Sequence, residues 1–157
     1  MNDRGTRSEA EDRAAIAEVL ARYAVALDSR NFGDLFHCFT EDALVEYAGV
    51  RLAPGVDAVI EHVKGLADMA ASQHNIGTIS VDVDGDRARA MSYAIAHLVR
   101  VSPGGHDVAH RGLSYEDELT RTSEGWRIAR RTHRVHWMTE ATASGPVEPV
   151  PTRSELL

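Results

Sequence analysis

Four side chains in this sequence are of types that can carry acid–base chemistry and stabilise charge in a reaction. His74 lies in ASQHNIG, where a helical pattern gives way to an alternating one, and junctions of this kind often form the mouth of a pocket. Histidine accepts a proton near neutral pH, as a general base must. Tyr23 and Arg131 can donate hydrogen bonds to an oxygen or halide that gains charge, and Asp28 is the fourth candidate.

Asp28 is the least expected of the four, because it ends the helical segment RYAVALD (22–28). A carboxylate at the negative end of a helix dipole costs about 0.3–1 kcal/mol. One ordinary explanation is an exposed acid that caps the following turn, SRNF. Ordinary explanations also exist for Tyr23 in the core, for Arg131 on a strand surface and for His74 in a local hydrogen bond.

Other kinds of site lack their sequence signatures. The chain has no G-x-S-x-G, G-x-x-x-x-G-K-[ST], G-x-G-x-x-G or H-E-x-x-H motif, which argues against nucleotide cofactors and against serine-hydrolase chemistry. His133 and His136 point to opposite faces of a predicted strand, and His106 and His110 flank a glycine-rich loop; neither pair has zinc-ligand spacing, so no metal site is predicted. The net charge of −7 argues against nucleic-acid binding, and no apolar run approaches the roughly 18 residues of a membrane span.

Hydrophobic periodicity predicts the helices that must position these side chains. Ser8 and Glu11 form a capping box that starts a helix near Glu9, and its apolar stripe runs to Leu27. A short helical piece is expected over 34–39, a strand over 42–47 and a second long helix over 54–70.

From about residue 72 the period changes from 3.6 to 2, which predicts a meander of long antiparallel strands. Its turns are expected at DGD (84–86), at SPGGHD (102–107) and at TSEG (122–125). Helices followed by such strands indicate an α+β domain with a curved sheet wrapped around the helices. The face of one strand that carries Ala94 and Ala96 has only small side chains, which leaves room for a closely packed helix or for a cavity.

The chain resembles the SnoaL-like family, within the superfamily built on the nuclear transport factor 2 fold. The resemblance lies in DRAAIAEVLARYAVALDSRNFGDLFHCFTEDALVEY, in QHNIGTISVDVDGDRARAMSYAIAH and in YEDELTRTSEGWRIARRTHRV, and it spans roughly residues 12–137. It implies a cone-shaped α+β barrel, in which a curved, mostly antiparallel sheet is closed by N-terminal helices around an apolar pocket. The branch it resembles includes scytalone dehydratase, hexachlorocyclohexane dehydrochlorinase and bile-acid 7α-dehydratase.

In that branch an aspartate near the end of the first helix pairs with a histidine at the start of the sheet, and Asp28 and His74 match those positions. The resemblance makes Tyr23 and Arg131 the polarising groups. Tyr23 and Asp28 are about 140° apart on an ideal helix, so we expect the helix to end or loosen before Asp28. Scytalone dehydratase uses a second histidine from a later strand, and His97 and His110 are the two candidates for that position here. The substrate-binding residues are expected to be Tyr47, Ser92, Ala94, Ala96, Tyr115 and His133.

The resemblance implies a cofactor-independent lyase, a dehydratase or dehydrohalogenase, that acts on a small cyclic or polycyclic compound through this pair. Three alternatives remain open. The same base serves an isomerase that moves a proton between carbons, which product analysis distinguishes. A non-catalytic ligand-binding or accessory subunit, and the β subunit of a ring-hydroxylating dioxygenase, share the fold.

Partners, location and domain limits are expectations of the same kind. Members of the branch are often homotrimers, so we expect a homo-oligomer, with a trimer before a dimer. The single cysteine and the lack of a signal-peptide apolar region are compatible with the cytoplasm. We expect a flexible N-terminus over 1–8, the domain over 9–140 and a C-terminal tail over 141–157.

Overall fold

The computed structural model describes residues 8–155, and most of the N-terminal segment that was expected to be flexible lies outside them. The helical elements precede most of the sheet; they are α1 (Glu9–Asp28), η1 (Phe32–His37), α2 (Val56–Val63), η2 (Lys64–Asp68) and, near the C-terminus, η3 (Arg153–Glu155). The strands are β1 (Phe39–Tyr47), β2 (Val50–Arg51), β3 (Ala71–Asp84), β4 (Arg87–Ser102), β5 (Gly105–Thr122) and β6 (Gly125–Thr142).

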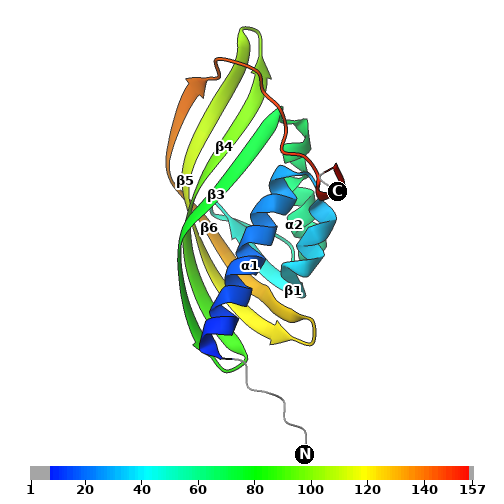
Figure 1. Cartoon of the computed structure of the whole chain (residues 1–157), viewed down its shortest axis with the longest axis vertical. Coiled ribbons are helices and arrows are strands. Elements are labelled where there is room, and N and C mark those ends of the chain that lie inside the picture. The colour runs from blue at the N-terminus through cyan, green and yellow to red at the C-terminus, as the bar shows by residue number, and fades with distance from the viewer. Residues whose placement is uncertain (1–7, 156–157) are drawn as a thin grey trace, which may run out of the picture.

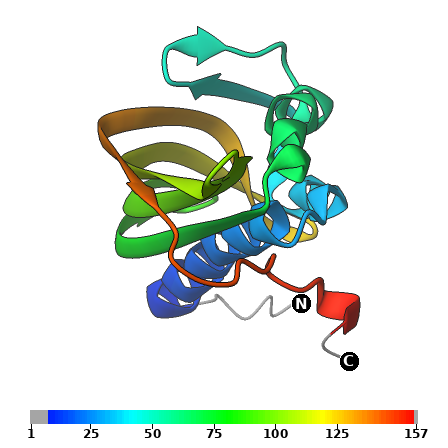
Figure 2. The same ribbon diagram turned by 90° about the horizontal axis from the view of Figure 1, so that it is seen from above.

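The strands form one six-stranded sheet in the order β2-β1-β6-β5-β4-β3. All neighbours are antiparallel except β1 and β6, which are parallel. The sheet is strongly curved, and α1 and α2 lie along its concave, open side (Figures 1 and 2). The predicted α+β architecture, with a curved and mostly antiparallel sheet around N-terminal helices, is confirmed.

Helix α1 is fixed at its start by local and by long-range hydrogen bonds. Ser8 and Glu11 form the predicted capping box, in which each side chain accepts a hydrogen bond from the other residue's backbone N–H. Asp12 accepts both Arg121 Nη atoms at 2.7 Å and the indole N–H of Trp126 at 3.1 Å. The Gly-Trp pair at the start of β6 therefore ties the last hairpin to the first turn of α1.

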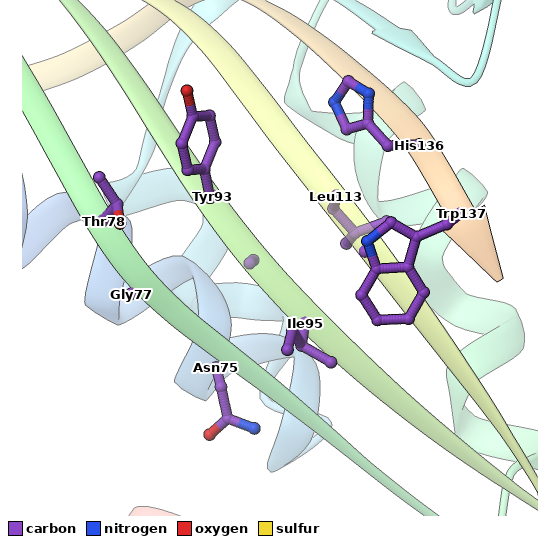
Figure 3. A pocket seen from close by; sticks show the side chains of 10 residues that line it. Asn75, Gly77, Thr78, Tyr93, Ile95, Leu113, His136 and Trp137 are labelled. Atoms are coloured by element: carbon purple, nitrogen blue, oxygen red, sulfur yellow. The ribbon is translucent and has the colours of Figure 1, made fainter. Parts of the chain in front are cut away.

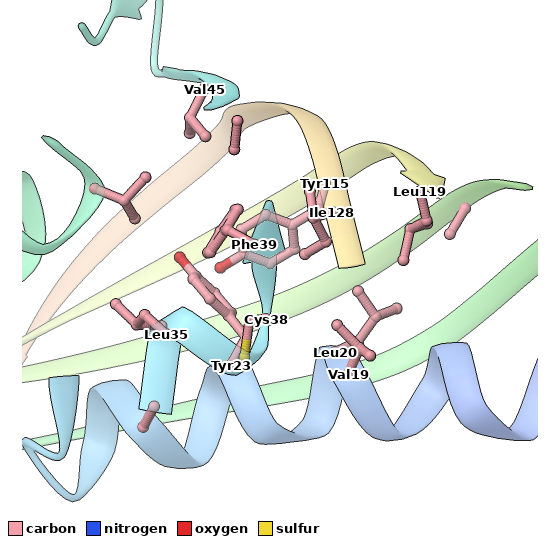
Figure 4. Close-up of a cluster of buried hydrophobic side chains, with 14 of the residues drawn as sticks. Val19, Leu20, Tyr23, Leu35, Cys38, Phe39, Val45, Tyr115, Leu119 and Ile128 are labelled. Atoms are coloured by element: carbon pink, nitrogen blue, oxygen red, sulfur yellow. The ribbon is translucent and has the colours of Figure 1, made fainter. Parts of the chain in front are cut away.

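The core fills the space between α1 and the concave face of the sheet (Figure 4). Tyr23 projects from α1 and meets Phe39 and Tyr115 edge-on, with ring centroids 6.0 and 5.7 Å apart. Buried and exposed residues alternate along β4, and the small residues Ala94 and Ala96 lie on its buried face. This alternation gives β4 one face toward the helices and one face away from them.

Several predicted boundaries need correction. The helix expected over 54–70 ends as α-helix at Val63 and continues as the 3₁₀ segment η2. The loop expected over 102–107 is shorter, because β5 begins at Gly105. The predicted turns at 84–86 and 122–125 are confirmed. Among residues 8–155, no helix is long and apolar enough to span a membrane.

Candidate functional site

The expectation that α1 must end before Asp28 is wrong, because Asp28 is the last residue of the helix. Tyr23 and Asp28 leave the helix in different directions. Tyr23 points between β1 and β5, whereas Asp28 points sideways to β3 and meets His74 there. His74 lines the cavity and Asp28 does not. Asp28 therefore needs to reach only His74, and the helix can stay intact although Tyr23 and Asp28 point in different directions.

The carboxylate of Asp28 accepts three hydrogen bonds from β3. The backbone N–H of His74 donates to Oδ2 at 2.7 Å, and the hydroxyl of Ser72 donates to Oδ1 at 2.9 Å. His74 Nδ1 lies 2.7 Å from Asp28 Oδ1. Because a carboxylate only accepts, Nδ1 carries the proton and the neutral ring has its lone pair on Nε2. Nε2 has no hydrogen-bond partner among the described residues.

Arg30 stabilises the end of α1 and offsets the unfavourable charge of Asp28 at the negative end of the helix dipole. Arg30 has a left-handed backbone (φ 61°), as residues just beyond a helix end often do. Its Nη1 donates to the carbonyls of Leu27 (2.7 Å) and Asp28 (3.2 Å) and to the hydroxyl of Ser72 (2.6 Å). A cation thus covers the negative helix end while Ser72 turns toward Asp28.

His74 borders a cavity of about 460 Å³ between the sheet, α1, α2 and the β1–β2 turn. This volume is within the range of small-molecule sites. The lining is mainly apolar, with three tyrosines and four basic side chains: Tyr23, Tyr47, Tyr115, His62, His74, Arg111 and His133. Larger hollows, of about 700, 700 and 1050 Å³, lie elsewhere on the molecule, and none of these borders the Asp28–His74 pair.

The tyrosines form a buried group at one end of this cavity. The hydroxyls of Tyr23 and Tyr47 are 2.7 Å apart. Burial raises the pKa of Tyr23, although the charge of Arg131 opposes this, and burial raises the pKa of Tyr47 and of Tyr115 well above the ordinary value. All three phenols therefore keep their protons at neutral pH and act as hydrogen-bond donors.

Arg131 lies behind the tyrosines and does not line the cavity. It donates to both carboxylate oxygens of Asp117, at 2.7 and 2.8 Å, and both side chains are fully buried. Burial lowers the pKa of Arg131, but Asp117 outweighs it, so the pKa is raised and the guanidinium stays charged. The guanidinium carbon is 4.2 Å from the ring centroid of Tyr23 and 4.4 Å from that of Tyr115.

His133 contacts the rings of Tyr47 and Tyr115, with centroid distances of 5.2 and 5.4 Å. Burial, and then the charges of Arg131 and Arg111, lower its pKa from 6.5 to about 4. Between these two values the unfolded chain binds the proton and the folded chain does not, so stability falls as the pH falls.

We therefore expect His133→Asn to flatten the loss of stability between pH 6.5 and 4. Between pH 7 and pH 4 the free energy of unfolding should fall less in the variant than in the unmodified chain. The difference between the two losses should be at most about 3 kcal/mol. Urea unfolding of both proteins at the two pH values measures this difference. Parallel pH profiles would contradict the assignment.

Five of the expected residues line the cavity together with His74: Tyr23, Tyr47, Ala96, Tyr115 and His133. Ser92 and Ala94 are buried on the same face of β4 but lie outside the lining. The sequence reasoning missed Arg111 and His62. Alternation along β5 from Tyr115 puts Arg111 on the cavity face, and this signal was present in the sequence.

His97 and His110 lie on the other face of the sheet. They are cross-strand neighbours, and their Nδ1 atoms are 2.7 Å apart. Successive residues of β4 point to opposite faces of the sheet, so His97 points away from the cavity that Ala96 lines. Neither His97 nor His110 is among the residues that line the cavity beside His74. Within residues 8–155 no three His, Cys, Asp or Glu side chains group as metal ligands.

The chain is similar to known proteins in sequence and in fold. The uncharacterized protein Rv2910c of Mycobacterium tuberculosis is 36% identical over 136 residues, which cover 82% of this chain and 90% of the relative. A protein of Novosphingobium aromaticivorans called "putative aromatic ring hydroxylase" has a TM-score of 0.73 and 27% identity, with 86% and 96% of the two chains covered.

Two further solved structures share the fold at lower identity. A Novosphingobium aromaticivorans protein called "Putative Scytalone Dehydratase" has a TM-score of 0.73 and 22% identity, and covers 90% of this chain and 94% of its own. A type 2 hexachlorocyclohexane dehydrochlorinase (LinA) has a TM-score of 0.76 and 16% identity, with coverage of 89% and 95%. Residues 8–132 match the family described as a SnoaL-like domain, and the chain therefore belongs to that family.

Proposed function

We propose that this protein is a cofactor-independent lyase, which removes a proton from carbon in a small cyclic or polycyclic compound while a hydroxyl or halide departs. The observation that carries the proposal is the ring of His74, held by Asp28 through Nδ1 and bordering the cavity with Nε2 unpaired. The family and the fold shared with a dehydrochlorinase support it.

The proposed step begins when Nε2 of His74 takes the proton. The electron pair of the broken C–H bond forms the new C=C bond, and the bond to the leaving group breaks. Asp28 stabilises the imidazolium, and Tyr23 donates a hydrogen bond to the group that gains charge. A leaving hydroxyl departs as water after it takes the proton back from the imidazolium of His74, directly or through solvent; a leaving halide departs as the anion, and His74 then releases its proton to solvent.

Arg131 has a different part in this proposal from the one that the sequence suggested. Its guanidinium is enclosed by Asp117 and by the rings of Tyr23 and Tyr115, so it acts on substrate through the phenols. Its charge opposes the effect of burial on the pKa of Tyr23 and makes that phenol a better donor.

The test is a panel of hydroxylated and halogenated ring compounds incubated in D₂O, in which NMR and mass spectrometry follow the product and an ion-selective electrode follows halide. Elimination gives a product that lacks the elements of water or of hydrogen halide, without deuterium at the new double bond. An isomerase gives a product of unchanged composition with a shifted double bond and deuterium on carbon, and a non-catalytic binding or accessory subunit gives no product. We place the activity in the cytoplasm, where the lone and buried thiol of Cys38 stays reduced.

We propose that the chain forms a homo-oligomer, a trimer before a dimer, through the face of the sheet opposite the helices (Figure 3). Tyr93, Ile95 and Trp137 are 55%, 40% and 48% exposed there and line an apolar groove. Light scattering should give a mass above one chain, and Tyr93→Glu with Ile95→Lys should reduce it to one chain. Val101→Lys, at the 75% exposed end of β4, is the control. A monomeric unmodified chain would contradict the proposal.

A further inference from the structure

Arg111 is a cation in the cavity that the proposed reaction does not use. It lies on β5 and is half-buried, and it lines the same cavity as His74. None of the carboxylates in the described part of the chain pairs with it, and it makes no hydrogen bond there. The other arginine near the cavity, Arg131, has its charge paired with Asp117 through Nε and Nη2 and does not line the cavity. A guanidinium next to apolar walls without a partner is suited to an anionic ligand group.

The strand register defines where this cation stands relative to the base. His74 on β3 is directly opposite Ala96 on β4, and Ala96 is directly opposite Arg111 on β5. Residues that face each other across antiparallel strands share one side of the sheet, and adjacent strands are about 4.8 Å apart. His74 and Arg111 thus flank Ala96, whose methyl group leaves the space between them open.

The charge around the cavity favours an anion. No aspartate or glutamate is among the lining residues, whereas Arg111 is, and the carboxylate of Asp28 is held behind His74 and does not line the cavity. The pKa of His133 is lowered mainly by burial and then by the charges of Arg131 and Arg111, so the charge of Arg111 is felt inside the cavity while His133 itself is uncharged at neutral pH. The charge of the lining is therefore opposite in sign to that of the whole chain, whose net charge is −7. The cavity therefore selects against cations although the protein as a whole attracts them.

We propose that the substrate is a cyclic carboxylate, whose carboxylate group is bound by the guanidinium fork of Arg111 while the carbon that loses its proton faces His74. The inference rests on the proposed function for the identity of the reacting carbon, but not for the binding of the anion. Arg111 is a binding residue that fixes the orientation of the ring, and the gap over Ala96 accommodates the ring.

The experiment compares ring carboxylates with their neutral amides, for example benzoate with benzamide and 1-naphthoate with 1-naphthamide. Dissociation constants are measured by calorimetry at low and high salt. The unmodified protein should bind the carboxylate more tightly than the amide, and Arg111→Met should lower carboxylate affinity roughly 10- to 100-fold without changing amide affinity. Arg111→Lys should fall between them, because lysine keeps the charge but loses the fork. Arg100→Met is the matched control, since Arg100 is exposed on the neighbouring strand.

Two outcomes overturn the inference. One is that no carboxylate in the set binds more tightly than its amide. The other is that Arg111→Met keeps the preference while His74→Gln removes it, which would place the anion on the imidazole. A preference that survives His74→Gln and disappears in Arg111→Met supports it. Turnover tests the proposed function separately. If carboxylate binding is lost in Arg111→Met but turnover is unchanged in His74→Gln, the inference about Arg111 is upheld and the lyase mechanism is rejected.

Discussion

Replacing His74 by glutamine should reduce turnover of a confirmed substrate by 10²- to 10⁴-fold, the range that general-base catalysis contributes. Glutamine cannot take a proton from carbon at neutral pH. The backbone N–H of residue 74 still donates to Asp28 in this variant, so the end of α1 keeps one of its anchors to β3. We therefore expect a folded protein that forms almost no elimination product.

Asp28→Asn tests the partner of the base. The carboxylate accepts one hydrogen bond from Ser72 and two from His74. In asparagine an NH₂ group replaces one of the two oxygens, so a donor faces a donor there. Turnover should fall by a similar factor, because the ring loses both its orientation and the charge that stabilises the imidazolium. An unpaired buried donor should also cost about 1–3 kcal/mol of stability.

Matched controls separate these effects from general damage. His37→Gln changes an exposed histidine, and Asp82→Asn changes an exposed carboxylate on the strand that carries His74. Both should retain full turnover. The double variant of Asp28 and His74 should be no slower than His74→Gln, since the two residues act as a unit. Undiminished turnover in His74→Gln would reject the mechanism.

Breaking the ion pair between Arg131 and Asp117 should produce the largest change in stability. Arg131→Met leaves the carboxylate of Asp117 buried and unpaired, and loss of one partner of a buried pair costs about 3–5 kcal/mol. That is a large fraction of the 5–15 kcal/mol by which most domains are stable. The variant also loses the cation that lies against the rings of Tyr23 and Tyr115.

Urea unfolding measures this effect against an exposed pair. Arg134 and Glu116 are 3.0 Å apart and about half exposed, so Arg134→Met should cost only about 0–1 kcal/mol. Replacement of both buried partners, with Arg131→Met and Asp117→Leu together, should recover much of the loss because no charge remains buried. Equal losses at the buried and at the exposed pair would contradict the view that Asp117 and Arg131 form a sealed unit.

Local signals made much of the fold predictable. The capping box of Ser8 and Glu11 and the turn around Gly85 depend on neighbouring residues, and both are found where the sequence places them. The limits of the second helix were harder to predict, because hydrophobic spacing cannot distinguish α2 from the 3₁₀ segment that follows it and contains Gly65.

The candidate site depends on long-range placement, which the sequence shows only in part. The family resemblance suggests that Asp28 and His74 form a pair. The sequence does not show that β3 passes beside the end of α1, and this placement lets the two residues meet while the helix stays intact. Asp117 and Arg131 are 14 positions apart and face each other across a hairpin with a bulge, so their pairing needs the register. Arg111 was missed although alternation from Tyr115 reaches it.

The position of Asp28 behind His74 also bears on how such a protein diversifies. The proposed catalytic pair belongs to α1 and β3, while much of the cavity wall comes from other elements, including Val63 of α2 and Leu66 of η2. Substitutions in the wall can alter which molecule fits without disturbing the three hydrogen bonds that hold the carboxylate. The wall and the pair can therefore change independently, so that a substitution in α2 or η2 alters the fit of a ligand while the contacts of Asp28 stay as they are.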